Sequence, residues 1–232
     1  NRGRVQGVVE TYAATSASPQ ASSSTCVNFA LSVPATSTVD FIFAGQAGAG
    51  NRFAPQRFEA TTRVRLNELH KLNITLGGAR ITTLLPVKES GKSTLGQFSV
   101  RAVDEWIVRD GIVVVLGLDY SRFLGASKAS AVSPRLGFRY DVNARTRVKA
   151  AYAPGGSESM VQSVAEFEDG PVLFRQPGTG AVAFVDGKAI MEKSRRFEFG
   201  VERVLDESSN VEATAFFDTT SGRGVGLMNA PL

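Results

Sequence analysis

The chain has 232 residues, and its 26 Lys and Arg against 22 Asp and Glu give a formal net charge of only +4. These charges are scattered along the chain, whereas a nucleic-acid-binding surface would cluster them, so that class of partner is excluded. No run of residues approaches the roughly 18 apolar positions of a membrane helix. The near-neutral mean hydropathy does not argue against a membrane, because strands that alternate apolar and polar residues average out.

The predicted elements are extended segments, and no stretch is predicted as a helix that could cover a sheet. In chain order they fall at 2–14, 26–33, 38–47, 55–66, 70–81, 95–109, 111–124, 132–142, 146–154, 194–205 and 211–219. Strands of about 9 to 15 residues exceed the usual 5 or 6 of soluble sheets and fit a tilted membrane crossing.

The predicted connections alternate between short and long. The short ones are Pro34–Ser37, Asn67–Leu69, Asp110, Asn143–Arg145 and Asp206–Asn210. The longer ones, rich in Gly, Ser, Ala and Pro, are 15–25, 48–54, 82–94, 125–131 and 155–193. An up-and-down sheet with short turns at one end and long loops at the other is typical of transmembrane β-barrels.

Alternation within the strands separates apolar from charged side chains, because successive residues point to opposite faces. In 135–143, for example, one face carries Leu136, Phe138 and Tyr140, and the other carries Arg135, Arg139 and Asp141. A soluble antiparallel sheet packed on a second sheet would show the same pattern. A soluble β-sandwich binding module therefore stays open as an alternative.

These patterns predict an all-β fold, an antiparallel up-and-down transmembrane β-barrel with about 11 strands present. Residues 1–232 are expected to form one outer-membrane barrel segment, with 155–193 as a long extracellular loop that forms its own hairpin between Val172–Gln176 and Ala181–Asp186. An odd strand count is unusual for a bacterial barrel. Because the chain also lacks an initial Met, a signal segment and a terminal aromatic strand, we expect an interior arc of a larger barrel.

The sequence offers little material for catalysis or metal binding. Cys26 is the one cysteine and His70 the one histidine, so a zinc site lacks ligands, and His70 is expected to be a solvated imidazole after a tight turn. Gly91–Thr94 imitates the end of a phosphate-binding loop, but Pro86 stands where that motif needs glycine and a strand follows. Gly178–Gly180 imitates a dinucleotide fingerprint without a βαβ unit around it. No enzyme, cofactor or metal is predicted.

Three segments resemble the barrel of TonB-dependent outer-membrane receptors. Val132–Asn143 followed by Thr146–Tyr152 is similar to a central hairpin of that family, with its "SPRLG…Y" opening and "AAY" return. Phe197–Arg203 followed by Ser209–Asp218 is similar to the next hairpin, and Gly111–Phe123 to the strand before both. The chain departs from the family pattern at Ala153–Gly156, and neither a plug domain nor a TonB box is seen.

The resemblance implies a receptor-like transporter in the outer membrane of a Gram-negative type of cell. Its expected partners are outer-membrane lipid, an unknown solute, and a plug domain and the TonB energy-coupling protein outside this chain. The polar candidates for the lumen wall, which we expect to be positively biased and largely ion-paired, are Arg63, Arg65, Arg135, Arg139, Arg147, Lys149, Asp119 and Asp141. The alternative is a surface-recognition or adhesion barrel whose loops bind a partner, with Phe167, Phe174 and Phe184 as recognition candidates.

Overall fold

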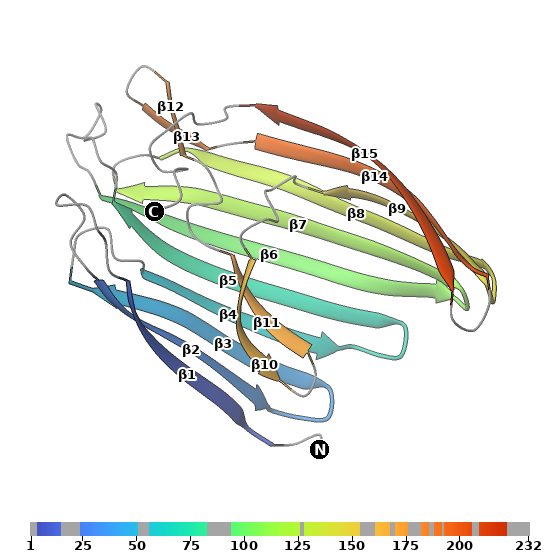
Figure 1. The fold of residues 1–232 in the computed structure, drawn as a ribbon, viewed down its shortest axis with the longest axis horizontal. Helices are drawn as coiled ribbons and strands as arrows, with labels where there is room; N and C mark the ends of the chain where they lie inside the picture. The colour runs from blue at the N-terminus through green and yellow to red at the C-terminus, as the bar shows by residue number, and fades with distance from the viewer. Residues whose placement is uncertain are drawn as a thin grey trace.

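The fold is that of a computed structural model, in which one large antiparallel sheet dominates (Figure 1). The structure describes residues 4–14, 24–50, 56–82, 94–125, 128–153, 161–167, 170–175, 182–185, 188–191, 193–205 and 209–221. The sheet consists of β1 (Gln6–Ala14), β2 (Ser24–Pro34), β3 (Val39–Ala49), β4 (Gln56–Arg65), β5 (His70–Thr82), β6 (Thr94–Arg109), β7 (Ile112–Gly125), β8 (Ser130–Asn143), β9 (Thr146–Ala153), β14 (Lys193–Val204) and β15 (Asn210–Ser221).

Each strand of the sheet pairs with its neighbours in chain order, so the order is β1-β2-β3-β4-β5-β6-β7-β8-β9-β14-β15. The 11 predicted strands are all present, with ends shifted by a few residues. An up-and-down antiparallel order puts alternate connections at opposite ends. The short-turn end carries 35–38, 66–69, 110–111, 144–145 and 205–209, and the long-loop end carries 15–23, 50–55, 83–93, 126–129 and 154–192. The lengths do not alternate strictly, because 126–129 is as short as 66–69.

Local hydrogen bonds explain why the short turns close where they do. The side-chain oxygen of Asn67 accepts hydrogen bonds from the backbone amides of Leu69 and His70, both at 2.8 Å. The side-chain oxygen of Asn143 accepts one from the amide of Arg145 at 2.9 Å. Gly111 has a φ of 77°, a region that residues with a Cβ rarely adopt. The turn chemistry of these residues therefore fixes the strand register.

The pairing predicted within 155–193 is wrong. The expected segments are strands, but they belong to two separate hairpins: β10 (Val161–Phe167) pairs with β11 (Gly170–Arg175), and β12 (Val182–Val185) with β13 (Lys188–Met191). Each pair closes across two residues, Glu168-Asp169 and Asp186-Gly187. A short loop costs less closure entropy than the longer one that would join β11 to β12.

The sheet is open within the described residues, since β1 pairs only with β2 and β15 only with β14. That separation of the first and last strands agrees with the predicted arc. Among the described residues, no helix is long and apolar enough to cross a membrane.

The strand register gives the sheet an apolar face and a polar face, because side chains of paired residues share a face. Across the middle of the sheet, one row of the apolar face runs through Leu76, Val100, Tyr120 and Val132. The apolar face predicted from alternation is thus confirmed, and in the described part of the chain neither a second sheet nor a helix covers it. Its large side chains are exposed, among them Val9, Leu31, Phe58, Leu76, Phe98, Leu116, Leu118, Val132, Leu136, Phe138, Phe197, Phe199 and Phe217.

The buried side chains lie on the opposite, polar face. Among the described residues other than glycine, every buried side chain is on this face, in β2, β3, β6 or β7. They are Cys26, Asn28, Ala30, Ile42, Ala44, Leu95, Val113 and Phe123. Cys26 is a free cysteine buried within β2. A soluble protein hides its apolar face, whereas the large apolar side chains of this sheet are exposed.

Candidate functional site

Charged side chains gather on the polar face, which is the candidate functional surface of the chain. Most of them come from neighbouring strands and meet across the ladder, because opposite charges in register can pair. Lys71 Nζ of β5, for example, lies 3.4 Å from Glu105 Oε1 of β6. Arg57 and Glu59 pair within one strand, β4. A hydroxyl pair, Thr61 and Thr75, joins β4 to β5 at 3.0 Å.

A three-membered ion-pair cluster lies at the centre of the sheet. Asp119 on β7 accepts from Arg101 Nε on β6 at 2.9 Å and from Arg135 Nε on β8 at 2.7 Å. The carboxylate is well shielded, with a side-chain exposure of 17%. Two guanidinium groups therefore share one acid, which leaves the cluster with a formal charge of +1.

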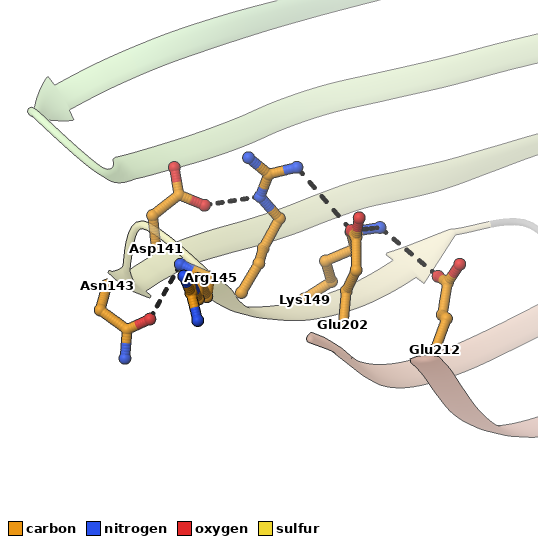
Figure 2. A network of polar contacts seen from close by, with 7 residues as sticks. Asp141, Asn143, Arg145, Lys149, Glu202 and Glu212 are labelled. Atoms are coloured by element: carbon orange, nitrogen blue, oxygen red, sulfur yellow. Dashed lines mark hydrogen bonds and ion pairs between the residues drawn. The ribbon is translucent and has the colours of Figure 1, made fainter. Parts of the chain in front are cut away.

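A longer network joins β8, β9, β14 and β15 near the short-turn end (Figure 2). Arg147 Nε lies 2.5 Å from Asp141 Oδ1, and Arg147 Nη1 lies 3.8 Å from Glu202 Oε2. Lys149 Nζ lies 2.8 Å from the same oxygen of Glu202 and 3.4 Å from Glu212 Oε1. Acidic and basic groups thus alternate along the network, so each basic group has an acid on either side. Nearer the long-loop end, Arg196 pairs with Glu198 and Asp218.

The register places all eight predicted polar candidates on this one face. Five of them are ion-paired: Arg135, Arg147, Lys149, Asp119 and Asp141. Arg63, Arg65 and Arg139 are exposed and make no ion pair with any residue that the structure describes. Asp119 and Asp141 pair with predicted candidates, Arg135 and Arg147. The expected pairing of the candidates with Glu59, Glu105 and Glu198 is not found, because these three acids pair instead with Arg57, Lys71 and Arg196.

The expected positive bias of the face as a whole is not found. In the described strands, the polar face carries as many acidic side chains as basic ones. The basic set is Arg57, Arg63, Arg65, Lys71, Arg101, Arg135, Arg139, Arg147, Lys149 and Arg196, and the acidic set is Glu10, Asp40, Glu59, Glu105, Asp119, Asp141, Glu198, Glu202, Glu212 and Asp218. Arg63 and Arg65 on β4 lie toward the short-turn end, and Arg65 is opposite Lys71 in register. Arg139 lies four strands away on β8.

The loop candidates fall in the two small hairpins. Phe167 ends β10, Phe174 lies in β11 and Phe184 in β12, and the surroundings of their side chains lie outside the described residues. The two glycine-rich segments that resemble nucleotide-binding motifs, 86–94 and 178–180, lie outside the described residues except for Thr94. Thr94 opens a strand, as expected.

A polar cluster on the apolar face was missed by the sequence analysis. His70 Nδ1 lies 2.8 Å from Asp104 Oδ2, and the His70 ring stacks on Trp106 at 5.6 Å with an interplanar angle of 10°. His70 is therefore not the freely solvated imidazole that was predicted. Asp104 Oδ1 is buried without a hydrogen-bond partner. The sequence feature that could have revealed this cluster is Asp104, because it is the one acidic residue among the β6 positions that point to the apolar face.

The described residues contain no group of three or more His, Cys, Asp or Glu side chains placed to hold a metal ion.

Comparison with known proteins gives a distant likeness among solved structures. No family model matches the chain, and no curated protein matches it. A solved structure, the siderophore receptor PirA from Pseudomonas aeruginosa, aligns over 94% of this chain with 13% sequence identity and a TM-score of 0.40. The chain spans 56% of the length of that receptor.

Proposed function

We propose that the chain forms part of the wall of a β-barrel in an outer membrane and serves the uptake or passage of a polar solute. The observation that carries this proposal is the exposed apolar face, opposite a face that carries ion-paired charges. Leu116, Leu118 and Phe138 are 45%, 50% and 42% exposed, while the ion-paired Asp119 on the other face is 17% exposed. Exposed apolar surface of this extent costs about 25 cal/mol per Å² in water and nothing in lipid.

The height of the apolar band on β7 supports a membrane setting, and the pair of His70 and Asp104 on β5 and β6 is the polar cluster at its level. On β7 the apolar face is uncharged from Ile112 to Tyr120, and Arg122 follows. From Ile112 to Arg122 the strand extends about 33 Å, which at a tilt of about 40° gives an apolar band about 25 Å tall. Trp106 and Tyr140 flank the band near the short-turn end, as amphipathic aromatic residues do at membrane interfaces.

The polar face suits a hydrated passage. Its paired charges keep the wall polar without a large net field, and they fix the strands to one another. Arg65 and Lys71, opposite each other in register, place two positive charges side by side near the short-turn end, which would favour anionic or polar solutes. No catalytic step is part of the proposal.

The finer assignment is a TonB-dependent receptor-like transporter, which would require a plug domain and the energy-coupling protein outside this chain. It is supported by the resemblance of 132–152 and 197–218 to family hairpins, since these segments are the hairpins β8–β9 and β14–β15. A plug-coding segment in the gene upstream of Asn1 is the expected finding, and a stalk or repeat module there would contradict this assignment.

A second candidate is a recognition barrel whose loops bind a partner while nothing passes through. The observation that favours it is the construction of 154–192 from two hairpins, β10–β11 and β12–β13, which is more than a tether needs. A recognition barrel predicts a stalk or repeat module, in place of a plug domain, in the gene upstream of Asn1.

The membrane proposal can be tested with the one tryptophan of the chain. Trp106 lies on the apolar face and is 37% exposed. In vesicles whose acyl chains carry bromine, the fluorescence of Trp106 should be strongly quenched, because the indole lies against lipid. Acrylamide in the water phase should quench it weakly.

A matched control moves the tryptophan to the other face. Val115 on β7 lies on the polar face, opposite Glu105, so the Trp106→Phe, Val115→Trp variant should resist the brominated lipid. Strong acrylamide quenching of Trp106 with no effect of bromine would overturn the membrane proposal.

A further inference from the structure

Two arginines lie on the apolar face at the long-loop end of the sheet. Arg80 on β5 and Arg122 on β7 are both exposed, and neither makes an ion pair with a residue that the structure describes. The face offers them no acid nearby, because Asp104 is its one acidic residue in the described strands and lies toward the opposite end. A cation bordering an apolar band needs a counterion.

The apolar face is recessed beside Arg80, at Gly78 of the same strand. Register places Gly96 of β6 beside Arg80, and Phe98 beside Arg122. A Cβ added at Gly78 would meet no atom within 4 Å, so the face has a shallow depression there. Phe58 and Phe98, the two register partners of Gly78, border it and are 48% and 39% exposed.

The opposite rim of the same face has a different charge pattern. Toward the short-turn end, Arg109 and Arg203 share the face with Asp104 and its partner His70. At the long-loop end, the exposed Arg195 adds a third basic residue. The long-loop rim is thus purely basic where its side chains are described, and an anionic partner fits it by charge.

We propose that Arg80 and Arg122 bind the phosphate of an anionic lipid headgroup, while an acyl chain of the same lipid lies over Gly78 between Phe58 and Phe98. The two Cα atoms are roughly 12 Å apart, from two strand spacings and a two-residue offset, so both guanidinium groups can reach one headgroup. Guanidinium binds phosphate by paired, charge-assisted hydrogen bonds. The inference rests on the proposed membrane function and names a partner of the same wall.

The test uses the full chain reconstituted in bilayer nanodiscs of phosphatidylcholine and phosphatidylglycerol, with the lipids that remain bound after release counted by native mass spectrometry. The wild-type chain should retain phosphatidylglycerol over phosphatidylcholine. Arg80→Gln with Arg122→Gln should weaken that retention about tenfold or more, as expected from the loss of charge-assisted hydrogen bonds. Gly78→Phe should weaken it without any change of charge, because the ring fills the recess.

Arg109→Gln with Arg203→Gln is the matched control, since it removes the same charge from the same face at the opposite rim and should leave the retention unchanged. Circular dichroism checks that each variant keeps its strand content. Equal loss in both double variants, no lipid preference in the wild type, or displacement of the lipid by millimolar inorganic phosphate would overturn the inference. All three leave the membrane proposal standing, because that depends on the quenching of Trp106.

Discussion

Leu116 and Val115 are neighbours on β7 that point to opposite faces of the sheet, so together they compare the two environments at one level. Leu116 is 45% exposed on the apolar face, and Val115 stands opposite Glu105 and Gly137 on the polar face. Any difference between substitutions at the two positions reports on the surroundings of the faces rather than on strand propensity.

Both new guanidinium groups would lie opposite a carboxylate in register, Asp104 for position 116 and Glu105 for position 115, so the two variants differ in the surroundings of the face. Leu116→Arg should lower the free energy of unfolding in a bilayer by about 2–4 kcal/mol, the cost of an arginine on the lipid face near the midplane. Val115→Arg should cost less than about 1 kcal/mol, because the polar face is hydrated and a lumen-facing arginine stays solvated. Reversible urea unfolding from vesicles measures both. Equal costs for the two variants would contradict the lipid-facing assignment of the apolar face.

Asp104 shows where alternation reasoning fails at the scale of one residue. It lies between Leu72 and Leu116 in register, on a face that is otherwise apolar at this level. Burial of one unpartnered oxygen costs about 1–3 kcal/mol, which the hydrogen bond from His70 and the stacked Trp106 offset in part. The sequence pattern of β6 showed that Asp104 is an acidic residue among apolar positions. Only the pairing of β5 with β6 identified His70 as its partner.

At the scale of elements, the tight turn between β6 and β7 depends on one glycine. Gly111 has a positive φ, and a Cβ there would lie 3.3 Å from the backbone oxygen of Asp141. The backbone amide of Asp141 also donates to the Gly111 oxygen at 2.7 Å, so the turn is tied to the end of β8.

Gly111→Ala should therefore lower the free energy of unfolding by about 1–2 kcal/mol, the cost of a left-handed conformation for a residue with a Cβ. Gly78→Ala is the control, because that position lies within a strand and its Cβ would meet open space. It should be neutral or slightly stabilising. Thermal or urea unfolding checks the pair, and equal effects would contradict the assigned turn.

The strands of the large sheet were predictable because period-two alternation and Asn, Asp, Gly and Pro turns agree along most of the chain. The pairing inside 154–192 was not, although one signal was available. Asp186-Gly187 lies between apolar runs, which is a strong local indication of a hairpin, and Asp169-Gly170 lies at the other turn. The ion-pair partners of Arg101 and Arg196 needed the register, which sequence alone leaves open.

In the whole molecule, the first and last strands of the sheet, β1 and β15, each have one outer edge. Among the described residues, β1 and β15 each pair on one side only. β15 is exposed along Asn210–Thr219, and its outer edge presents backbone groups that have no partner in the sheet. In hydrocarbon each such group costs several kcal/mol, so a membrane wall requires that both edges be paired.

We therefore expect the amide protons of β15 to exchange with solvent as slowly in a bilayer as those of β7, which is paired on both sides. Hydrogen–deuterium exchange of the reconstituted protein measures this, with β7 as the internal reference. Fast exchange along β15 beside slow exchange in β7 would mean an edge open to water, which contradicts the membrane wall.

The partner of that edge can be identified by cross-linking. In a Cys26→Ser background, cysteines at Val9 on β1 and Ala213 on β15 should form no disulfide within one chain, because we expect other strands to pair with these edges. The matched pair Val9→Cys with Phe29→Cys, register partners on β1 and β2, should cross-link readily. A disulfide between positions 9 and 213 would show that the chain closes on itself, since the Cα atoms of a disulfide lie within about 7 Å. The arc would then be a small complete pore, and the receptor-like assignment would give way to a simple channel.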